Sequence, residues 1–154
     1  MSVLAALRPD EWNFPLFLHV LGAMTMFGSL ILAVTALAGG TRPGTAALRQ
    51  LGFRALLWAT VPAWIVMRVA AEWIADKEGL GDLDEEPAWV GIGYMTAEPG
   101  LLLMIVATVL ASVSARRARE GGDGSTQVRV ALALVSLLLL AYLVAIWAMT
   151  AKPD

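Results

Sequence analysis

The chain contains no cysteine and only one histidine, His19. The absence of cysteine excludes disulfides, thiolate metal sites and thiol catalysis. A single histidine excludes zinc held by several histidines, and it excludes a heme with two histidine ligands from the same protomer. The sequence also lacks a nucleophile-elbow motif, a phosphate-binding glycine loop and a nucleic-acid-binding signature, so we expect no nucleic-acid partner.

Charged residues are scarce, at 16% of 154 residues, and apolar residues account for 58%. Residues 14–38 and 130–151 carry no charge, and two interrupted apolar segments cover residues 55–75 and 88–115. About 20 helical residues cross a hydrocarbon core of about 30 Å, and helices satisfy their own backbone in lipid. With short connections between them, these segments predict an all-α fold: a four-helix transmembrane up-down bundle forming one domain, residues 1–154. The expected helices cover about residues 13–39, 46–75, 88–116 and 126–151.

The predicted loops differ in charge. The loop after the first helix contains three arginines and no acid, and the loop after the third contains four arginines and two acids. The segment on the other side, "DKEGLGDLDEE", is strongly acidic. Because basic loops remain in the cytoplasm, we expect the acidic loop with Asp82 and both termini to lie on the outer side. We expect a multi-pass protein of the cell inner (cytoplasmic) membrane with its N-terminus and its C-terminus outside (N-out/C-out).

Four ionisable residues fall within the predicted membrane core, namely His19, Arg68, Glu72 and Glu98. A charged side chain at mid-depth costs about 2.5 to 3.5 kcal/mol, so such residues usually face the bundle interior. At 1.5 Å per residue, His19 lies about 9 Å and Arg68 about 10 to 12 Å from the outer end of its helix. All four therefore share the outer half of the membrane and form the predicted ligand-binding residues.

Arg68 and Glu72 are spaced i, i+4, which places them on one helix face, where they can pair. They form either an internal ion pair or a site in which Arg68 holds an anionic ligand group and Glu72 orients it. Pro62 removes a helical hydrogen bond and is expected to kink this helix, which would widen the outer half of the bundle.

The segment "TAEPG", residues 96–100, interrupts the third helix pattern. Pro99 disfavours helical geometry at Glu98. The segment is either a kinked continuous helix or the start of a helix that Thr96 caps, with "AWVGIGYM" interfacial or re-entrant. The second interpretation predicts a break near residues 98–100, and both place Glu98 near the outer mouth of the bundle.

His19 shares a helix face with the small residues Gly22 and Ala23 and with Met26 and Ser29. Small residues permit close helix contact, so this face is expected to point inward. His19 is then either an interhelical hydrogen-bonding residue or a ligand of heme iron or copper, the one metal ligand that we predict. Methionines on the outer side would suit either metal.

The first helix, "FLHVLGAMTMFGSLIL", resembles that of small bacterial membrane proteins related to the copper-resistance D-type proteins and the J-type protoporphyrinogen oxidase. The end, "AIWAMTAKPD", resembles the finish of an uncharacterised family in that group. The resemblance implies four membrane helices and a heme- or metal-proximal role for His19. The chain lacks the membrane-embedded lysine of the oxidase and the further histidines of a copper importer.

Three functions follow from these patterns. The first is binding of heme, copper or another small ligand by the outer-half polar residues. The second is an accessory or structural membrane subunit whose polar residues lock the bundle or bind a partner. The third is a small transporter. The expected partners are the lipid bilayer and either a homo-oligomer or a larger membrane complex; whether the chain is an enzyme stays open.

Overall fold

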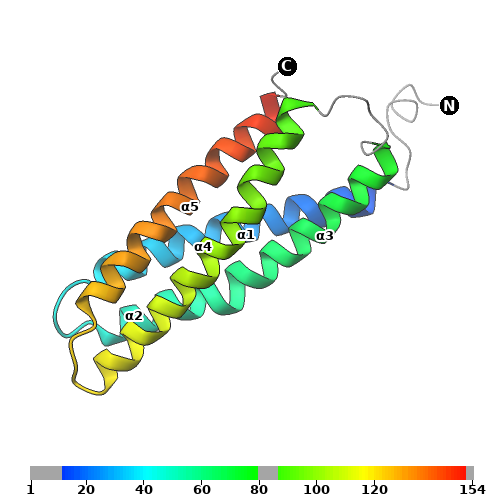
Figure 1. The fold of residues 1–154 in the computed structure, drawn as a ribbon. Coiled ribbons are helices and arrows are strands. Elements are labelled where there is room, and N and C mark those ends of the chain that lie inside the picture. Colours follow the sequence, from blue (N-terminus) through cyan, green and yellow to red (C-terminus); the bar gives the residue numbers. More distant parts are fainter. Residues whose placement is uncertain (1–11, 80–86, 152–154) are drawn as a thin grey trace.

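The computed structural model describes residues 12–79 and 87–151, and these form a bundle of long helices (Figure 1). Four helices are long and apolar enough to cross a membrane, which confirms the predicted four-helix transmembrane bundle. The described elements are α1 Asn13–Gly39, α2 Ala46–Ala55, the π-helix η3 Leu56–Thr60, α3 Val61–Glu78, α4 Ala88–Arg119 and α5 Ser125–Ala151. The second crossing, Ala46–Glu78, consists of α2, η3 and α3.

Small side chains line the contacts between the helices. Ala33 of α1, Ala107 and Ala111 of α4 and Ala131 of α5 are completely buried. Without a hydrophobic driving force between helices in lipid, such residues favour association because they allow the backbones to approach closely. Larger apolar side chains, including Leu140, remain exposed on the outside, where lipid replaces water as the solvent.

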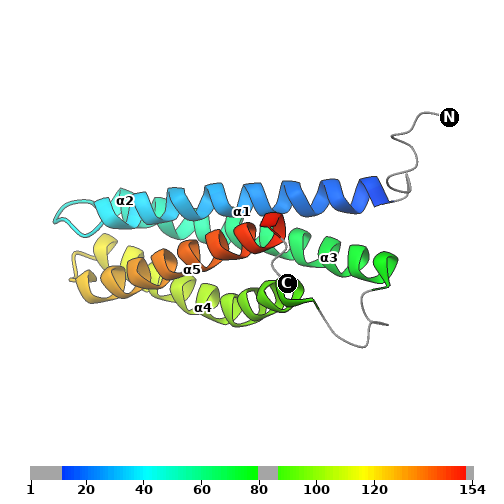
Figure 2. The same ribbon diagram turned by 90° about the horizontal axis from the view of Figure 1, so that it is seen from above.

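The helices separate into two pairs toward one end of the bundle. α1 packs against α2 and α3, and α4 packs against α5, whereas α3 and α4 make little direct contact. Figures 1 and 2 show α1 and α3 diverging from α4 and α5 toward the end where α1 begins and α5 ends. The two basic loops join the helices at the opposite end. The polar residues that the sequence placed in the outer half therefore lie toward the end where α3 and α4 diverge.

The second crossing changes its hydrogen-bond pattern next to Pro62. In η3 the Val61 amide donates to Leu56 O, one residue beyond the α-helical partner. The Thr60 hydroxyl lies 3.2 Å from Ala55 O and 2.8 Å from the Ser29 hydroxyl of α1. The π segment thus ends two residues before Pro62, where side-chain hydroxyls supplement the altered backbone pattern.

The predicted break near residues 98–100 is wrong, because α4 is continuous and contains Pro99 in its interior. Thr96 does not cap a helix start; its hydroxyl donates to Ile92 O within the same helix. Pro99 removes only one amide, whereas a break in lipid would leave several backbone groups without partners. The acidic loop with Asp82 lies outside the described residues, as do both terminal segments.

Candidate functional site

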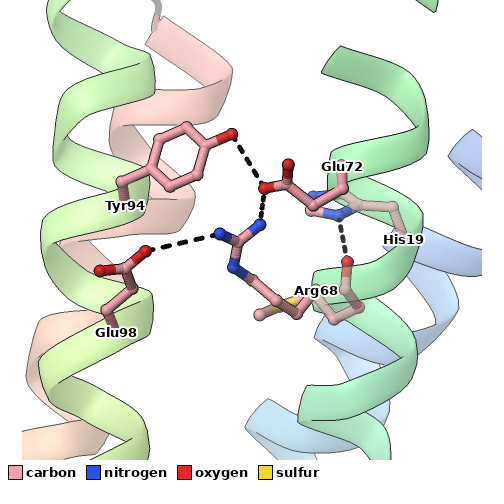
Figure 3. Close-up of polar contacts among 6 residues, drawn as sticks. His19, Arg68, Glu72, Tyr94 and Glu98 are labelled. Carbon is pink, nitrogen blue, oxygen red and sulfur yellow. Dashed lines mark hydrogen bonds and ion pairs between the residues drawn. The ribbon is translucent and has the colours of Figure 1, made fainter. Parts of the chain in front are cut away.

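Arg68 connects α3 and α4, two helices that make little direct contact. Its guanidinium donates a hydrogen bond to the Glu72 carboxylate one turn later on α3. On the other side its Nη2 lies 3.6 Å from Glu98 Oε1 of α4. Figure 3 shows the arginine side chain extending from α3 toward α4 between these two carboxylates. The expected Arg68–Glu72 pair is present, and the fold adds Glu98 to it.

Tyr94 of α4 completes this group, and the sequence interpretation did not include it. Its hydroxyl donates to Glu72 Oε1 at 2.9 Å, and Arg68 Cζ lies 4.7 Å from the centre of its ring. A guanidinium over an aromatic face is attracted by the ring quadrupole. Tyr94 and Glu98 are spaced i, i+4, which is the signal that could have placed Tyr94 on this face of α4. We call these four residues, Arg68, Glu72, Tyr94 and Glu98, the outer cluster.

The charges of the outer cluster do not balance. It contains one guanidinium and two carboxylates, so its formal charge is −1 when both acids are ionised. The Arg68 side chain is 20% exposed, whereas Glu72 is 53% and Glu98 69% exposed. The positive group is therefore enclosed, and the surplus negative charge lies on the open side of the cluster.

Inward of the outer cluster lie two buried polar atoms that find no hydrogen-bond partner among the described residues. Trp64 precedes Arg68 by four residues, which places it on the same face of α3, one turn deeper. Its indole N–H and the hydroxyl of Tyr142 on α5 lie near each other but do not reach hydrogen-bond geometry. Tyr142 is 3% exposed, so each is a buried donor that lacks an acceptor. Such orphaned groups in an interior are costly unless water or a ligand meets them.

His19 belongs to a different contact. Its Nδ1 lies 3.1 Å from Met67 O, and it donates a hydrogen bond to this backbone carbonyl of α3. One turn later Gly22 faces the same residue so closely that a Cβ there would lie 2.8 Å from Met67 N. The histidine therefore lies beside a close contact of α1 with α3, as expected for an interhelical hydrogen-bonding residue. Of the four predicted ligand-binding residues, the fold brings Arg68, Glu72 and Glu98 together.

The residues do not assemble a recognisable metal centre. In the part of the chain that the structure describes, no three His, Cys, Asp or Glu side chains lie close enough together to hold a metal ion. His19 offers one imidazole, and its hydrogen bond to a carbonyl would leave Nε2 as the ligating nitrogen. One nitrogen is an incomplete donor set for a copper ion, whereas heme iron needs only one axial imidazole besides its porphyrin. The heme or copper prediction thus has no structural support beyond that single ring.

Comparison with protein-family models, with curated proteins and with solved structures finds no match to this chain.

Proposed function

We propose that this multi-pass membrane protein binds a small amphiphilic ligand at the outer cluster, and that the ligand presents a cationic group to Glu72 and Glu98. The observation that carries the proposal is the surplus carboxylate, more than half exposed, between helices that diverge. Arg68 is ten residues before the end of α3, and Glu98 is ten residues after the start of α4, which is about 15 Å along either axis. At that depth an unmatched charge is costly and attracts a counter-ion.

An anionic ligand group fits this arrangement less well than we expected from the sequence alone. Arg68 already faces two carboxylates and the ring of Tyr94. An anion would have to displace one acid from the guanidinium and remain close to the other. Coulomb repulsion between like charges at such distances opposes this. A cationic group, in contrast, would neutralise the cluster without breaking any of its internal contacts.

The interior next to the cluster favours a ligand that also carries a hydrogen-bond acceptor. The Trp64 indole, one turn inward of Arg68, and the buried Tyr142 hydroxyl are donors that find no acceptor within residues 12–79 and 87–151. Ligand sites are usually lined by apolar side chains with a few precisely placed polar groups. This region likewise places two polar donors within an apolar helix bundle. The ligand class is therefore an amphiphile with an ammonium or similar cation and a carbonyl, ether or hydroxyl deeper in the membrane.

Two lipophilic ions of matched size and opposite charge test whether the outer cluster prefers a cation or an anion. We expect tetraphenylphosphonium to raise the unfolding temperature of the detergent-purified protein and tetraphenylborate to leave it unchanged. At about ten times its Kd a ligand contributes about 1.4 kcal/mol, or about 3 to 6 °C for a chain of this size. The Glu98→Gln variant should lose the phosphonium effect, measured by thermal unfolding with intrinsic tryptophan fluorescence.

Glu120→Gln is the matched control for this experiment. Glu120 is an exposed carboxylate at the opposite end of the bundle, where it pairs with Arg116. It should keep the full phosphonium response. Equal responses to the two ions, or an unchanged response in Glu98→Gln, would contradict a cation site in the outer cluster.

The second candidate is an accessory or structural subunit in a homo-oligomer or a larger membrane complex. It is favoured by the internal pairing of the polar groups, since Arg68, Glu72 and Tyr94 all contact one another. Such a network would hold α3 and α4 together across the diverging end of the bundle. On this alternative neither lipophilic ion stabilises the protein, so the same titration separates the two functions.

We also propose that the outer cluster faces the outside of the cytoplasmic membrane, with the two basic loops inside. Because the chain lacks cysteine, single-cysteine variants can report the orientation directly. Glu78→Cys, at the end of α3, should react with a membrane-impermeant maleimide in intact spheroplasts. Gly122→Cys, between α4 and α5, should react only after lysis. Labelling of Gly122→Cys in intact spheroplasts would show that the orientation is the reverse of the one proposed.

A further inference from the structure

A second polar region lies at the opposite end of the bundle. There the loop between α1 and α2 and the loop between α4 and α5 enclose an open hollow of about 570 Å³. Figure 1 shows the two loops side by side at this end. Both are tight connections, with Gly44 and Gly121 at φ values of 75°, a conformation that favours glycine. Arg49 and Arg129 are the two basic residues of the lining, and Asp123 is its acid.

Arg49 is buried, with 6% of its surface exposed, although the sequence pattern indicated only a cytoplasmic loop residue. Its Nε donates to Gly40 O at 2.7 Å, and one terminal nitrogen lies 3.4 Å from the Ser114 hydroxyl. Within residues 12–79 and 87–151 no carboxylate forms an ion pair with it. A guanidinium has five N–H donors, and a buried charge without a counter-ion is unfavourable. Arg49 therefore adds a buried positive charge to the hollow without a direct ion pair from these residues.

Both carboxylate oxygens of Asp123, the acid of the lining, already accept hydrogen bonds. Asp123 Oδ1 accepts a hydrogen bond from the Ser125 amide at 2.8 Å, and Oδ2 accepts one from the Ser125 hydroxyl at 3.0 Å. These bonds, with the attraction of Arg49 and Arg129, hold the pKa of the Asp123 carboxyl below its usual range. Asp123 is thus an anion bound to the start of α5. With two arginines and one aspartate, the lining keeps a formal charge of +1.

The backbone adds donors to this positive lining. Ala46, the first residue of α2, also lines the hollow. Thr45 does not cap that helix, because its hydroxyl donates to Arg42 O instead. The first amides of a helix have no intrahelical acceptor, and they favour anions when a basic side chain lies beside them.

We propose that this hollow binds a phosphate group, held by Arg49 and Arg129 with the Ala46 amide at the start of α2. The group belongs either to the headgroup of an anionic phospholipid or to a free phosphate, since the chemistry of recognition is the same. The hollow lies at the end of the membrane-crossing helices, where headgroups are found. The proposal is independent of the ligand assigned to the outer cluster, from which it is separated by the length of the bundle.

One experiment with two parts distinguishes an anionic phospholipid from free phosphate as the ligand. The protein is placed in vesicles of phosphatidylcholine with or without one fifth phosphatidylglycerol, and inorganic phosphate is titrated against chloride at equal ionic strength. Stabilisation by phosphatidylglycerol alone identifies the lipid, and stabilisation by inorganic phosphate identifies the free ion. We expect Arg129→Gln to weaken the binding about tenfold, since it removes one charge-assisted contact while leaving the buried Arg49 in place.

Arg54→Gln is the control, because Arg54 is an exposed arginine at the same end that does not line the hollow. It should bind as tightly as the unmodified chain. Arg49→Lys keeps the charge but loses the planar pair of donors, so it should also bind more weakly while remaining folded. A response to neither source, or equal losses in Arg54→Gln and Arg129→Gln, would overturn the proposal and leave Arg49 as a link between α1, α2 and α4.

Discussion

Replacing Gly22 with alanine is expected to lower the unfolding temperature by about 5 °C, because overpacking costs about 2 kcal/mol and each kcal/mol shifts Tm by about 2 to 4 °C. The new Cβ would lie 2.8 Å from Met67 N and 2.9 Å from Met67 Cα. These are backbone atoms, so no side-chain rotation relieves the contact and α1 must move away from α3. The hydrogen bond from His19 to Met67 O would lengthen with it.

Gly28→Ala on the same helix is the matched control. A Cβ at Gly28 meets nothing within 4 Å, and alanine favours a helix by up to about 1 kcal/mol over glycine. Its unfolding temperature should be unchanged or slightly raised, as measured by circular dichroism of the detergent-purified protein. Equal behaviour of the two variants would mean that α1 and α3 do not approach at Met67.

Replacing Arg68 with alanine is expected to give the second large loss of stability, on the order of 2 kcal/mol. The change leaves Glu72 and Glu98 near each other without the guanidinium between them. Removal of one partner from a fully buried pair costs about 3 to 5 kcal/mol, and the exposure of both carboxylates lowers that figure here. The double variant Arg68→Ala/Glu72→Ala should recover part of the loss, because it removes one of the two unpaired acids.

The Arg116–Glu120 pair provides a control with the same i, i+4 spacing. Both of its side chains are more than half exposed at the basic end of the bundle, so Arg116→Ala should not measurably change the unfolding temperature. Losses in the Arg68→Ala and Glu72→Ala variants that simply add in the double variant would show that the two residues do not interact.

Local pattern predicted the helices, because a charge-free run of sufficient length can satisfy its backbone in lipid only as a helix. It also predicted that Arg68 and Glu72 share a face, since the i, i+4 spacing depends on helix geometry alone. The same local rules were misleading at Pro99. There the restriction that Pro99 places on the backbone of Glu98 predicted a break, but ending a helix within the membrane costs more, and α4 continues through Pro99.

The partners across helices required the tertiary structure. The small-residue face of α1 indicated that His19 points inward, but only the packing of α1 on α3 selected Met67 O as its acceptor. Glu98 and Tyr94 lie on α4, and their approach to Arg68 depends on how far α4 diverges from α3. The sequence contains no direct measure of that divergence, which is the sum of many contacts along the bundle.

Arg49 shows most clearly the difference between what the sequence predicts and what the tertiary structure adds. By sequence alone it is one of several arginines whose positive charge indicates the cytoplasmic side, and that argument concerns only their number and position. The fold distinguishes it from its neighbour Arg54, which stays exposed, by burying Arg49 between Gly40 O and the Ser114 hydroxyl. Composition and periodicity determined which segments enter the membrane. The rotation and spacing of the helices, set by close packing of small residues, decided which polar groups meet there.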